Sequence, residues 1–459
     1  MEKIIIKTKN FLIKPLVAED VTENYLNWFK DQTVKKFITS FEYKDIDSLK
    51  KYVNEQSNKK DVIFLGIFTY QGLHIGNIKF ENIDRKKSST TLGILIGDKN
   101  FRGKGVAVEV INACISWFFY NLSVSRFFLG VDKCNLFAIK AYKKSGFKEY
   151  MSSNNFSKKN KSLFMIRDYS NIQRIAIGAA QFGMNYGIAN NTGQTSFSEL
   201  SKILNSAQKL GINTIDTATS YGESENMLGK FGVENWQVVS KLSSINKLAN
   251  IENFVQKSLE SSLNKLKLKS LYGLLIHKPE DLLSNYGKNI FKAIQKLKEK
   301  GLIKKIGVSI YDIKDIDLII PKFQIDLIQA PFNIIDQRLK TSGWLQKIKD
   351  SNIELHTRSA FLQGLLLMNK NLRPNKFDRW QQIWNNWEKF LKDSGKEPHE
   401  ICLGFVLSNP EIDKVILGFD NLNQLTKVLK PINPIKLKLP PNILSNDMNL
   451  INPSMWEKL

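Results

Sequence analysis

Four side chains that could carry out proton and hydride chemistry follow one another in the second half of the sequence. Asp216 and Tyr221 lie in the stretch IDTATSY, Lys241 lies near the end of VVSKL, and His277 ends LYGLLIH. Each residue is at or just past the carboxyl end of a predicted strand. A (β/α)₈ barrel builds its active site at the carboxyl ends of its strands, so these four side chains are expected to meet.

The four residue types suit a carbonyl group that accepts a hydride. Its oxygen gains negative charge and needs a proton, which Tyr221 could donate if a nearby ammonium lowered its ordinary pKa of about 10. Lys241 could supply that ammonium, Asp216 could keep Lys241 charged and oriented, and His277 could hydrogen-bond the carbonyl. The hydride would come from a nicotinamide cofactor. Considered singly, Asp216 would be interpreted as a capping residue, Tyr221 as a surface tyrosine, Lys241 as a solvated lysine and His277 as a hydrogen-bonded core histidine.

Apolar runs that alternate with helical stretches predict the elements that position these residues. Helices are expected at residues 197–210, 251–266 and 288–300, and a longer excursion at residues 368–393 carries three tryptophans expected to pack in the core. Eight strands are expected at residues 174–181, 212–218, 236–242, 271–278, 306–311, 326–332, 353–359 and 414–419. Eight such units over this length match one barrel.

This half resembles the aldo-keto reductase superfamily over about residues 172–429. The resemblance rests on IDTATSYGESENMLG, VVSKL, LLIHKP, IGVSIY, IQAPFNIIDQR, RSAFLQGLL and VILGFDN. It implies a TIM barrel and assigns Asp216, Tyr221, Lys241 and His277 as the catalytic set. It also implies that Ser309, Gln329 and Asn333 lie near the nicotinamide.

Two sequence segments near the seventh and eighth predicted strands contain the remaining cofactor-binding residues that this resemblance implies. Many relatives have a tyrosine that stacks on the nicotinamide where HTRSAFLQG places Arg358, so Arg358 could lie over the ring or hold its amide, beside Ser359. In ILGFDNLNQL, Gly418 leads into a helix start where Asn421 and Gln424 could bind phosphate or adenine. Asp420 would repel a 2′-phosphate and Lys427 could compensate, so both NADPH and NADH stay open.

A glycine-containing loop at the start of a helix is the main feature of the first half. Between a predicted strand at 90–97 and a helix running to about residue 120, the loop FRGKGVA could hold a pyrophosphate with its backbone N–H groups. It lacks the GK[ST] of a Walker loop and the G-x-G-x-x-G of a dinucleotide fold. Other elements are expected at residues 3–16, 18–37, 45–57, 62–70, 74–83, 126–131, 136–145 and in a final strand pair within 148–168.

This half resembles the GNAT acetyltransferase superfamily over about residues 7–168, through the loop and the block NLFAIKAYKKSGFKE. The resemblance implies an α+β domain with a mixed sheet. Asn135 would bind the pantetheine arm, Tyr142 would protonate the departing thiolate, and Glu81 is a candidate base whose alternative is a solvated strand carboxylate. The pyrophosphate of acetyl-CoA would be held by the backbone of Arg102, Gly103, Lys104, Gly105, Val106 and Ala107.

Length and composition fit two globular domains, expected at residues 1–170 and 171–459. The net charge of +23 is shared by both halves, which favours phosphorylated ligands over nucleic-acid binding. The three cysteines have no metal or redox spacing, so no metal is expected. No apolar run reaches membrane-spanning length and no signal peptide is evident, so a cytoplasmic protein without membrane contact is expected.

The sequence therefore predicts a bifunctional enzyme that transfers acetyl from acetyl-CoA to an amine and performs NAD(P)H-dependent carbonyl or alcohol chemistry. Both resemblances favour small-molecule substrates, with amino-sugar nucleotides for modified-sugar or surface-polysaccharide synthesis as the hypothesis. Two alternatives stay open: a protein N-terminal acetyltransferase fused to an unrelated reductase, and a cofactor sensor without turnover. The oligomeric state is not predicted.

Overall fold

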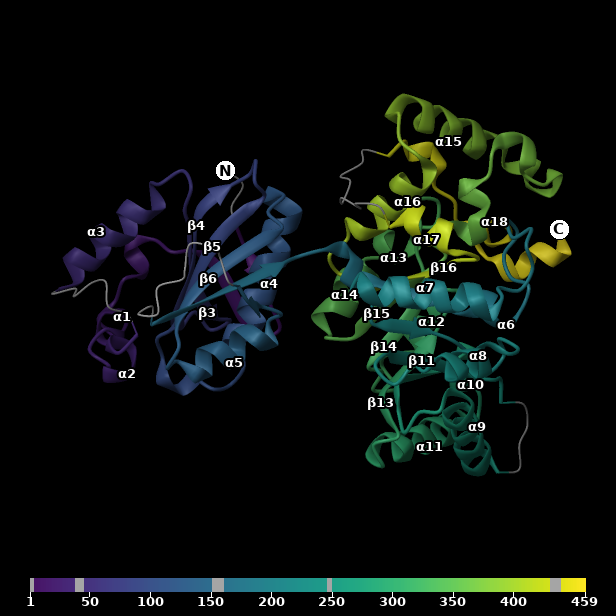
Figure 1. Cartoon of the computed structure of the whole chain (residues 1–459), viewed down its shortest axis with the longest axis horizontal. Helices are drawn as coiled ribbons and strands as arrows, with labels where there is room; N and C mark the ends of the chain where they lie inside the picture. The colour runs from purple at the N-terminus through teal and green to yellow at the C-terminus, as the bar shows by residue number, and fades with distance from the viewer. Residues whose placement is uncertain (1–3, 38–44, 151–160, 246–249, 430–438) are drawn as a thin grey trace. The chain divides into compact units, whose positions relative to one another are not determined.

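The computed structural model describes residues 4–37, 45–150, 161–245, 250–429 and 439–459. The chain divides into two compact units, Met1–Ser170 and Asn171–Leu459 (Figure 1). The first is an α+β unit with a mixed sheet and the second is a closed parallel barrel, which agrees with the predicted fold classes.

One eight-stranded sheet forms the frame of the first unit, in the order β1-β2-β3-β4-β5-β6-β8-β7. Strands β5 and β6 are parallel, and the other neighbours are antiparallel. The strands are β1 Ile6–Lys7, β2 Phe11–Pro15, β3 Ile63–Thr69, β4 His74–Asp84, β5 Ser89–Ile96, β6 Arg126–Asp132, β7 Lys148–Glu149 and β8 Ser162–Asp168.

Helices cover both faces of this sheet (Figure 1). Helix α4 buries Val110, Cys114 and Phe118 against one face, in a core shared with the central strands. Tyr25 and Leu49, from α1 and α3, pack in a separate core on the other face. The helices are α1 Glu23–Trp28, α2 Gln32–Lys35, α3 Ile46–Ser57, α4 Val106–Leu122 and α5 Leu136–Lys144.

Two predictions for the first elements are wrong. The expected strand 3–16 is two short strands, because Thr8 turns the chain by donating its backbone N–H to the Phe11 carbonyl at 2.9 Å. The expected helix 18–37 is a 3₁₀ turn followed by α1 and α2, because the side chains of Thr22 and Asp31 each cap a new helix start. Polar side chains that bond locally to backbone N–H groups interrupt a helix that apolar periodicity alone suggests.

Strands β5 and β6 separate along their length. Their pairing runs only from Ser89 opposite Arg126 to Thr91 opposite Phe128, although β5 continues to Ile96. Beyond this point β5 still pairs with β4, and β6 still pairs with β8. The sheet therefore opens between its two parallel strands, on the side from which the chain enters the loop before α4.

Eight parallel strands close the barrel of the second unit, and each strand pairs with the next until β16 returns to β9. Val239, Leu275 and Leu327 pack inside it. The strands are β9 Ile175–Gly178, β10 Thr214–Asp216, β11 Gln237–Leu242, β12 Leu271–Ile276, β13 Ile303–Ser309, β14 Leu327–Pro331, β15 Glu354–Arg358 and β16 Lys414–Gly418. Every predicted strand run thus contains or overlaps one observed strand.

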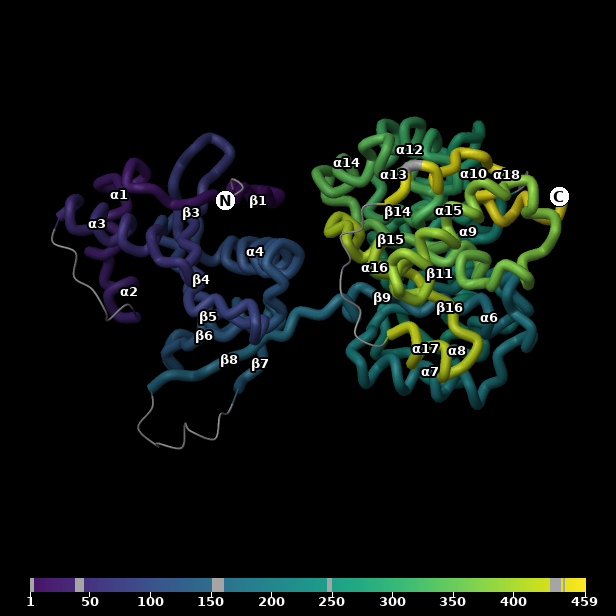
Figure 2. Tube along the Cα trace, turned by 90° about the horizontal axis from the view of Figure 1, so that it is seen from above, coloured from purple at the N-terminus to yellow at the C-terminus, as the bar shows by residue number. Residues whose placement is uncertain are grey.

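Helices surround the barrel, and α7 and α17 lie side by side although they come from its beginning and end (Figure 2). Trp384 and Trp387, on α15, are buried and donate their indole N–H groups to backbone carbonyls, so this excursion packs in the core as expected. The helices used below are α6 Ala180–Gly183, α7 Phe197–Lys209, α9 Ile251–Leu266, α12 Lys314–Ile319, α15 Gln381–Ser394, α17 Leu422–Val428 and α18 Met448–Ile451.

Over the described ranges, no helix combines the length and apolar character that crossing a bilayer requires.

Candidate active sites

Asp216, Tyr221 and Lys241 meet at the carboxyl ends of β10 and β11. The Lys241 Nζ donates to Asp216 Oδ2 at 2.7 Å, to the Thr217 carbonyl at 2.9 Å and to Tyr221 Oη at 3.4 Å. Lys241 is fully buried, and 4% of Asp216 is exposed. The three bonds fix the ammonium beside the phenol oxygen.

His277 completes the group from the end of β12. Its ring lies edge-on to the Tyr221 ring, with centroids 6.2 Å apart, and its Nδ1 is 3.4 Å from Ser220 Oγ. The structure thus brings together all four residues that the sequence pattern selects.

Gln329, from the end of β14, orients this group although it was expected near the nicotinamide. Its Nε2 donates to Asp216 Oδ1 at 2.7 Å. The carboxylate is therefore held on one oxygen by Gln329 and on the other by Lys241. Gln329 acts on the phenol through Asp216 and Lys241.

Burial dominates the proton equilibria of this site. It raises the pKa of Tyr221 well above its ordinary value, and Asp216 adds to the rise while Arg358 opposes it. Burial also lowers the pKa of Lys241, against the opposing effect of Asp216. The pKa of Tyr221 is therefore raised, whereas the sequence led us to expect a lowered one, because removal from water disfavours the tyrosinate.

His277 is neutral at physiological pH. Burial lowers its pKa to about 4, with further lowering by Lys241 and Arg358 and an opposing effect of Asp216. A neutral imidazole keeps one N–H to donate and adds no positive charge beside Lys241.

Arg358 lies at the end of β15, where its guanidinium covers the Tyr311 ring at 3.8 Å from the centroid. Its Nη2 donates to the Ile310 carbonyl at 2.8 Å. The sequence pattern had suggested that Arg358 lies over a nicotinamide ring or holds its amide; in the structure the guanidinium lies over a protein ring. Tyr311 was not among the sequence candidates, because nothing in its local spacing predicts this stacking.

A cavity of about 400 Å³ opens beside Asp216 and Tyr221, between the first and the last strands of the barrel. Four of the expected cofactor residues line it, Arg358, Ser359, Gly418 and Gln424. Tyr186, which also lines it, was missed by the sequence analysis; burial raises its pKa to about 12 and Gln363 donates to its hydroxyl at 3.2 Å.

Two other expected cofactor residues, Asn333 and Ser309, are buried outside this cavity. Asn333 is buried, its amide oxygen accepts the backbone N–H groups of Ile335 and Asp336, and its Nδ2 donates to the Ser359 carbonyl at 3.1 Å. Ser309 is buried beside Gln329 in the β13–β14 register. Neither residue lines the cavity of about 400 Å³.

At the predicted anion site after β16, several polar groups already form hydrogen bonds with one another. The Asn421 side chain caps α17 by accepting from the Gln424 N–H at 3.0 Å. Gln424 binds Asp420 twice, donating to Oδ2 at 3.0 Å and accepting from the backbone N–H at 2.8 Å. Asp420 Oδ1 is buried without a hydrogen-bond partner, and Asp420 lines the cavity together with Lys427.

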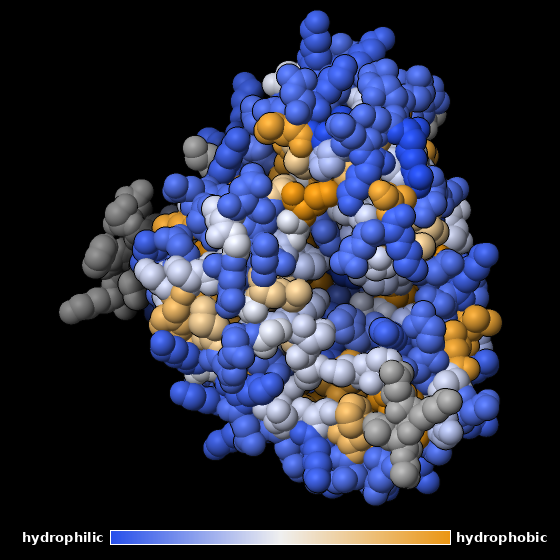
Figure 3. Space-filling view, turned by 90° about the vertical axis from the view of Figure 1, so that its right-hand side faces the viewer, coloured by the Kyte–Doolittle hydropathy of each residue, from blue (hydrophilic) through white to orange (hydrophobic). Residues whose placement is uncertain are grey.

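A second cavity, of about 1190 Å³, adjoins the first at the mouth of the barrel. It is lined by Ser220, His277 and Tyr311, whereas Tyr221 and Arg358 line the first. The two contacts Tyr221–His277 and Arg358–Tyr311 therefore lie between the cavities. This side of the molecule is visibly hollowed (Figure 3).

The loop before α4 in the first unit has the backbone freedom that an anion site needs. Gly103 and Gly105 have φ angles of +74° and +83°, and the space beside both Cα atoms is open. Gly105 is the N-cap of the 17-residue helix α4, and no side chain caps it. The first N–H groups of the helix, from Val106 and Ala107 onward, are thus left for a ligand.

Arg102 holds this loop in place by its side chain. It donates to the Ile96 and Gly97 carbonyls at 2.9 and 2.6 Å and to Asp31 at 2.8 Å. A backbone hydrogen bond from Thr33 and the bond from Arg102 lower the pKa of Asp31 to about 2. Lys104, by contrast, is exposed at the tip of the loop.

Asn135 and Tyr142 lie at the two ends of α5. The Asn135 side chain caps this helix by accepting from the Ala138 N–H at 3.2 Å. Tyr142 is buried against Phe147, and burial raises its pKa to about 12. The phenol is therefore protonated at neutral pH.

Glu81 faces the α1–α3 side of the sheet and pairs with Lys79 at 2.7 Å. Three buried polar atoms on the same side have no partner, Trp28 Nε1, His74 Nδ1 and Asn77 Nδ2. His74 Nε2 lies 3.0 Å from the Gly76 carbonyl and 2.8 Å from Asn77 Oδ1. These residues were not sequence candidates, because a buried orphan atom is visible only once the strand is packed.

Both units match known protein families. Residues 174–438 match the Aldo/keto reductase family and residues 10–148 match the Acetyltransferase (GNAT) domain. The aldo-keto reductase YhdN of Bacillus subtilis is 24% identical over 290 residues, covering 56% of this chain and 86% of that protein. L-galactose dehydrogenase of Arabidopsis thaliana is 25% identical over 286 residues, covering 58% and 86%.

The first unit has its own relative. An N-acetyltransferase 9-like protein of Caenorhabditis briggsae is 28% identical over 145 residues, covering 29% of this chain and 73% of that protein. The two kinds of relative thus match different parts of the chain.

Proposed function

Because the chain belongs to the aldo-keto reductase family and carries a GNAT acetyltransferase domain, we propose that it is a bifunctional enzyme acting on related small molecules. Acetyl transfer from acetyl-CoA and NAD(P)H-dependent oxidoreduction follow from the two families. The residues that perform them, and the amino-sugar substrates, are the proposal.

The observation that carries the reductase proposal is the contact of Lys241 with both Asp216 and Tyr221. In the reduction direction Tyr221 donates its phenolic proton to the substrate oxygen, and the ammonium at 3.4 Å stabilises the tyrosinate that results. The raised pKa keeps Tyr221 protonated until it reacts. Neutral His277 donates a hydrogen bond to the same oxygen and fixes its direction.

The cavity of about 400 Å³ fits a nicotinamide cofactor, which supplies the hydride when bound. It reaches Tyr221 at one end and the loop after β16 at the other, where Asp420 has an unpartnered carboxylate oxygen suited to a hydroxyl donor. Arg358 and Ser359 would hold the reactive end, and Gly418 and Gln424 the other. The carboxylate of Asp420 favours a free ribose hydroxyl over a 2′-phosphate, so NADH is the preferred form in this proposal.

In the first unit, the uncapped start of α4 fits the pyrophosphate of acetyl-CoA, which supplies the acetyl group. The opening between β5 and β6 leaves room for the arm that carries it. Tyr142 is protonated and would give its proton to the departing thiolate. Glu81 remains the proposed base, and its carboxylate pairs with Lys79.

We propose an amino sugar, free or nucleotide-linked, as the common substrate, in the synthesis of modified sugars for surface polysaccharide. Fusion of two enzymes in one chain favours consecutive steps, and one relative of the barrel is named for a sugar, L-galactose. The net charge of +23 suits phosphorylated ligands.

The test is a panel of amino sugars and their nucleotides given to the intact protein with acetyl-CoA, and separately with NADH or NADPH. Release of free thiol reports acetyl transfer, and absorbance of the nicotinamide reports oxidoreduction. Turnover of one sugar and its acetylated form by the two units supports consecutive steps. If no member of the panel is acetylated, the amino-sugar proposal is withdrawn.

A further inference from the structure

The second cavity, of about 1190 Å³, is where a substrate would approach Tyr221 and His277. Its walls come from the loops after β11, β12 and β13 and from the segment containing α18. Met448, Asn452 and Ser454 supply that last wall. The cavity is therefore built from parts of the chain that are far apart in the sequence.

Carboxylates dominate the charge of these walls. Among the described residues that line the cavity, Asp281, Asp312, Asp315 and Glu280 are acidic and Lys278 is the one lysine or arginine. None of the four carboxylates forms an ion pair with a lysine or arginine among the residues that the structure describes. Asp281 instead accepts hydrogen bonds from Ser244 at 3.3 Å and from a backbone N–H at 3.2 Å.

The carboxylates also interact with one another. Burial raises the pKa of Asp315, and Glu280 and Asp312 raise it further. Burial likewise raises the pKa of Asp281, and Lys278 opposes that rise. Lys278 and Glu280 are both exposed and offset each other in charge, so the three aspartates leave the interior of the cavity negative.

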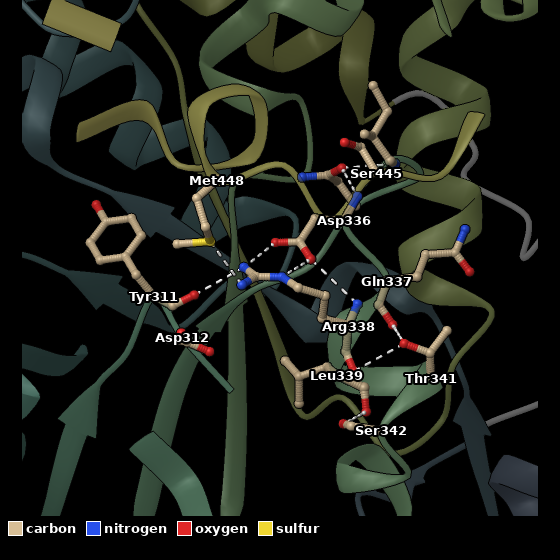
Figure 4. Close-up of polar contacts among 12 residues, drawn as sticks. Tyr311, Asp312, Asp336, Gln337, Arg338, Leu339, Thr341, Ser342, Ser445 and Met448 are labelled. Atoms are coloured by element: carbon tan, nitrogen blue, oxygen red, sulfur yellow. Dashed lines mark hydrogen bonds and ion pairs between the residues drawn. The ribbon is translucent and has the colours of Figure 1, made fainter. Parts of the chain in front are cut away.

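Arg338 lies near Asp312 and interacts with it electrostatically, but its hydrogen bonds go to other residues (Figure 4). Its guanidinium is paired with Asp336, at 2.8 Å to Oδ1 and 2.9 Å to Oδ2. It also donates to the Tyr311 carbonyl at 2.9 Å and contacts Met448 Sδ at 3.1 Å. Arg338 thus fastens two walls of the cavity while its charge is matched by Asp336.

We propose that this cavity selects a substrate that carries an ammonium group, so that the barrel acts on the free amine before the first unit acetylates it. A negative interior attracts a cation and repels a phosphate or carboxylate, so of the two forms of substrate proposed above it favours the free amino sugar over the nucleotide-linked one. The cavity opens onto His277 and Tyr311, so a substrate held by these carboxylates would have its reacting carbon near the catalytic group. The inference rests on the proposed function and names its substrate class.

The order of steps follows from the charge on nitrogen. In acetyl transfer the thioester C–S bond of acetyl-CoA breaks and a C–N bond forms. The ammonium nitrogen loses two protons, one to a base and one balanced by protonation of the departing thiolate, so that coenzyme A leaves as the thiol. The amide product is neutral and no longer attracts the aspartates. Hydride and proton exchange at carbon and oxygen leave the amine unchanged, so only acetylation removes the charge that this cavity recognises.

The first test compares three aldehydes of similar size, 3-(trimethylammonio)benzaldehyde, 3-nitrobenzaldehyde and 3-carboxybenzaldehyde, as substrates of the intact protein. We expect kcat/KM for the cation to exceed that for the anion by roughly tenfold or more at low salt, and the ratio to shrink as salt is added. A ratio at or below one in the unmodified protein would overturn the proposal.

Matched variants show whether the cavity aspartates cause this preference for the cationic aldehyde. The double change Asp312→Asn with Asp315→Asn keeps side-chain shape and is expected to lower the cation-to-anion ratio about threefold to tenfold. The control is Asp317→Asn, since Asp317 lies on the same helix α12 but does not line the cavity. An equal fall of the ratio in the control would show that the cavity is not responsible.

Measurements of ligand binding distinguish failure of this inference from failure of the proposed reductase function. The Kd values of benzyltrimethylammonium and benzoate are measured calorimetrically, with and without NAD⁺. Tighter binding of the cation than of the anion, with loss of this difference in the double variant, supports the inference. If such binding is found but no aldehyde is turned over, only the reductase proposal fails. D-glucosamine and N-acetyl-D-glucosamine then test the order of steps, and equal or tighter binding of the acetylated sugar would refute it.

Discussion

Tyr221 is the residue on which the reductase mechanism depends most directly. Tyr221→Phe removes the proton donor but leaves Lys241, Asp216 and Gln329 in contact. We expect kcat to fall roughly 10²- to 10⁴-fold, with the nicotinamide Kd nearly unchanged. Acetyl transfer by the same variant is the internal control, because its site lies in the other unit. Retained reductase activity would show that the proton comes from elsewhere.

His277 gives the site a testable pH dependence. Its pKa of about 4 lies below the ordinary value of about 6.5, so the folded protein binds fewer protons than the unfolded chain between these values. Its contribution to the free energy of unfolding therefore falls as pH drops from about 6.5 to about 4, by no more than about 3 kcal/mol.

The corresponding kinetic prediction concerns kcat/KM of the reductase. We expect no inflection near pH 6.5 and a change only as the pH approaches 4. The measurement is a pH profile with a neutral aldehyde, and an inflection near 6.5 would show that His277 titrates normally.

The proposed cofactor site makes the carboxylate of Asp420 responsible for the preference between NADH and NADPH. Asp420→Asn removes the negative charge and keeps the bonds with Gln424 possible. We expect the ratio of kcat/KM for NADH to that for NADPH to fall about tenfold, mainly because NADPH is used better. A ratio that does not move would show that the 2′-phosphate lies away from Asp420.

At the scale of elements, the start of α4 is a backbone site, so it is best probed through a glycine. Gly105→Ala forces an L-residue into φ +83° and should cost about 1–2 kcal/mol of stability. Gly72→Ala, in the turn after β3, imposes similar strain at φ +87° with equally open space. We expect the Kd for acetyl-CoA to rise about tenfold in the first variant only, measured by calorimetry. Equal affinities would place the pyrophosphate elsewhere.

The boundaries of helices and strands were predictable from sequence where a single effect, the burial of apolar side chains, determines them. Parallel barrel strands are buried on both faces, so apolar runs such as LYGLLIH mark them clearly. Residues 18–37 were misread because Thr22 and Asp31 bond locally and restart the helix. The meeting of the four residues was predictable because Asp216, Lys241 and His277 lie at or just past the ends of strands and Tyr221 lies in the loop after β10. The contact of Arg358 with Tyr311 and the grouping of aspartates in the second cavity join residues from separate parts of the chain. Local spacing in the sequence does not predict such contacts.

At the scale of the whole molecule, the two units have separate hydrophobic cores. Unfolding is therefore expected in two steps, which calorimetry resolves as two transitions. Acetyl-CoA should raise the temperature of one transition and a nicotinamide cofactor that of the other, because each ligand binds one folded unit. A single transition raised by both ligands would show that the units unfold together.

The wall supplied by Met448, Asn452 and Ser454 has a consequence for synthesis of the protein. A ribosome polymerises the chain from its amino end, at roughly 5–20 residues per second. The catalytic tetrad and all eight strands are therefore made before the segment that Arg338 fastens beside Tyr311. During translation the aspartates proposed to select the charge of the substrate are thus made before the wall that completes their cavity.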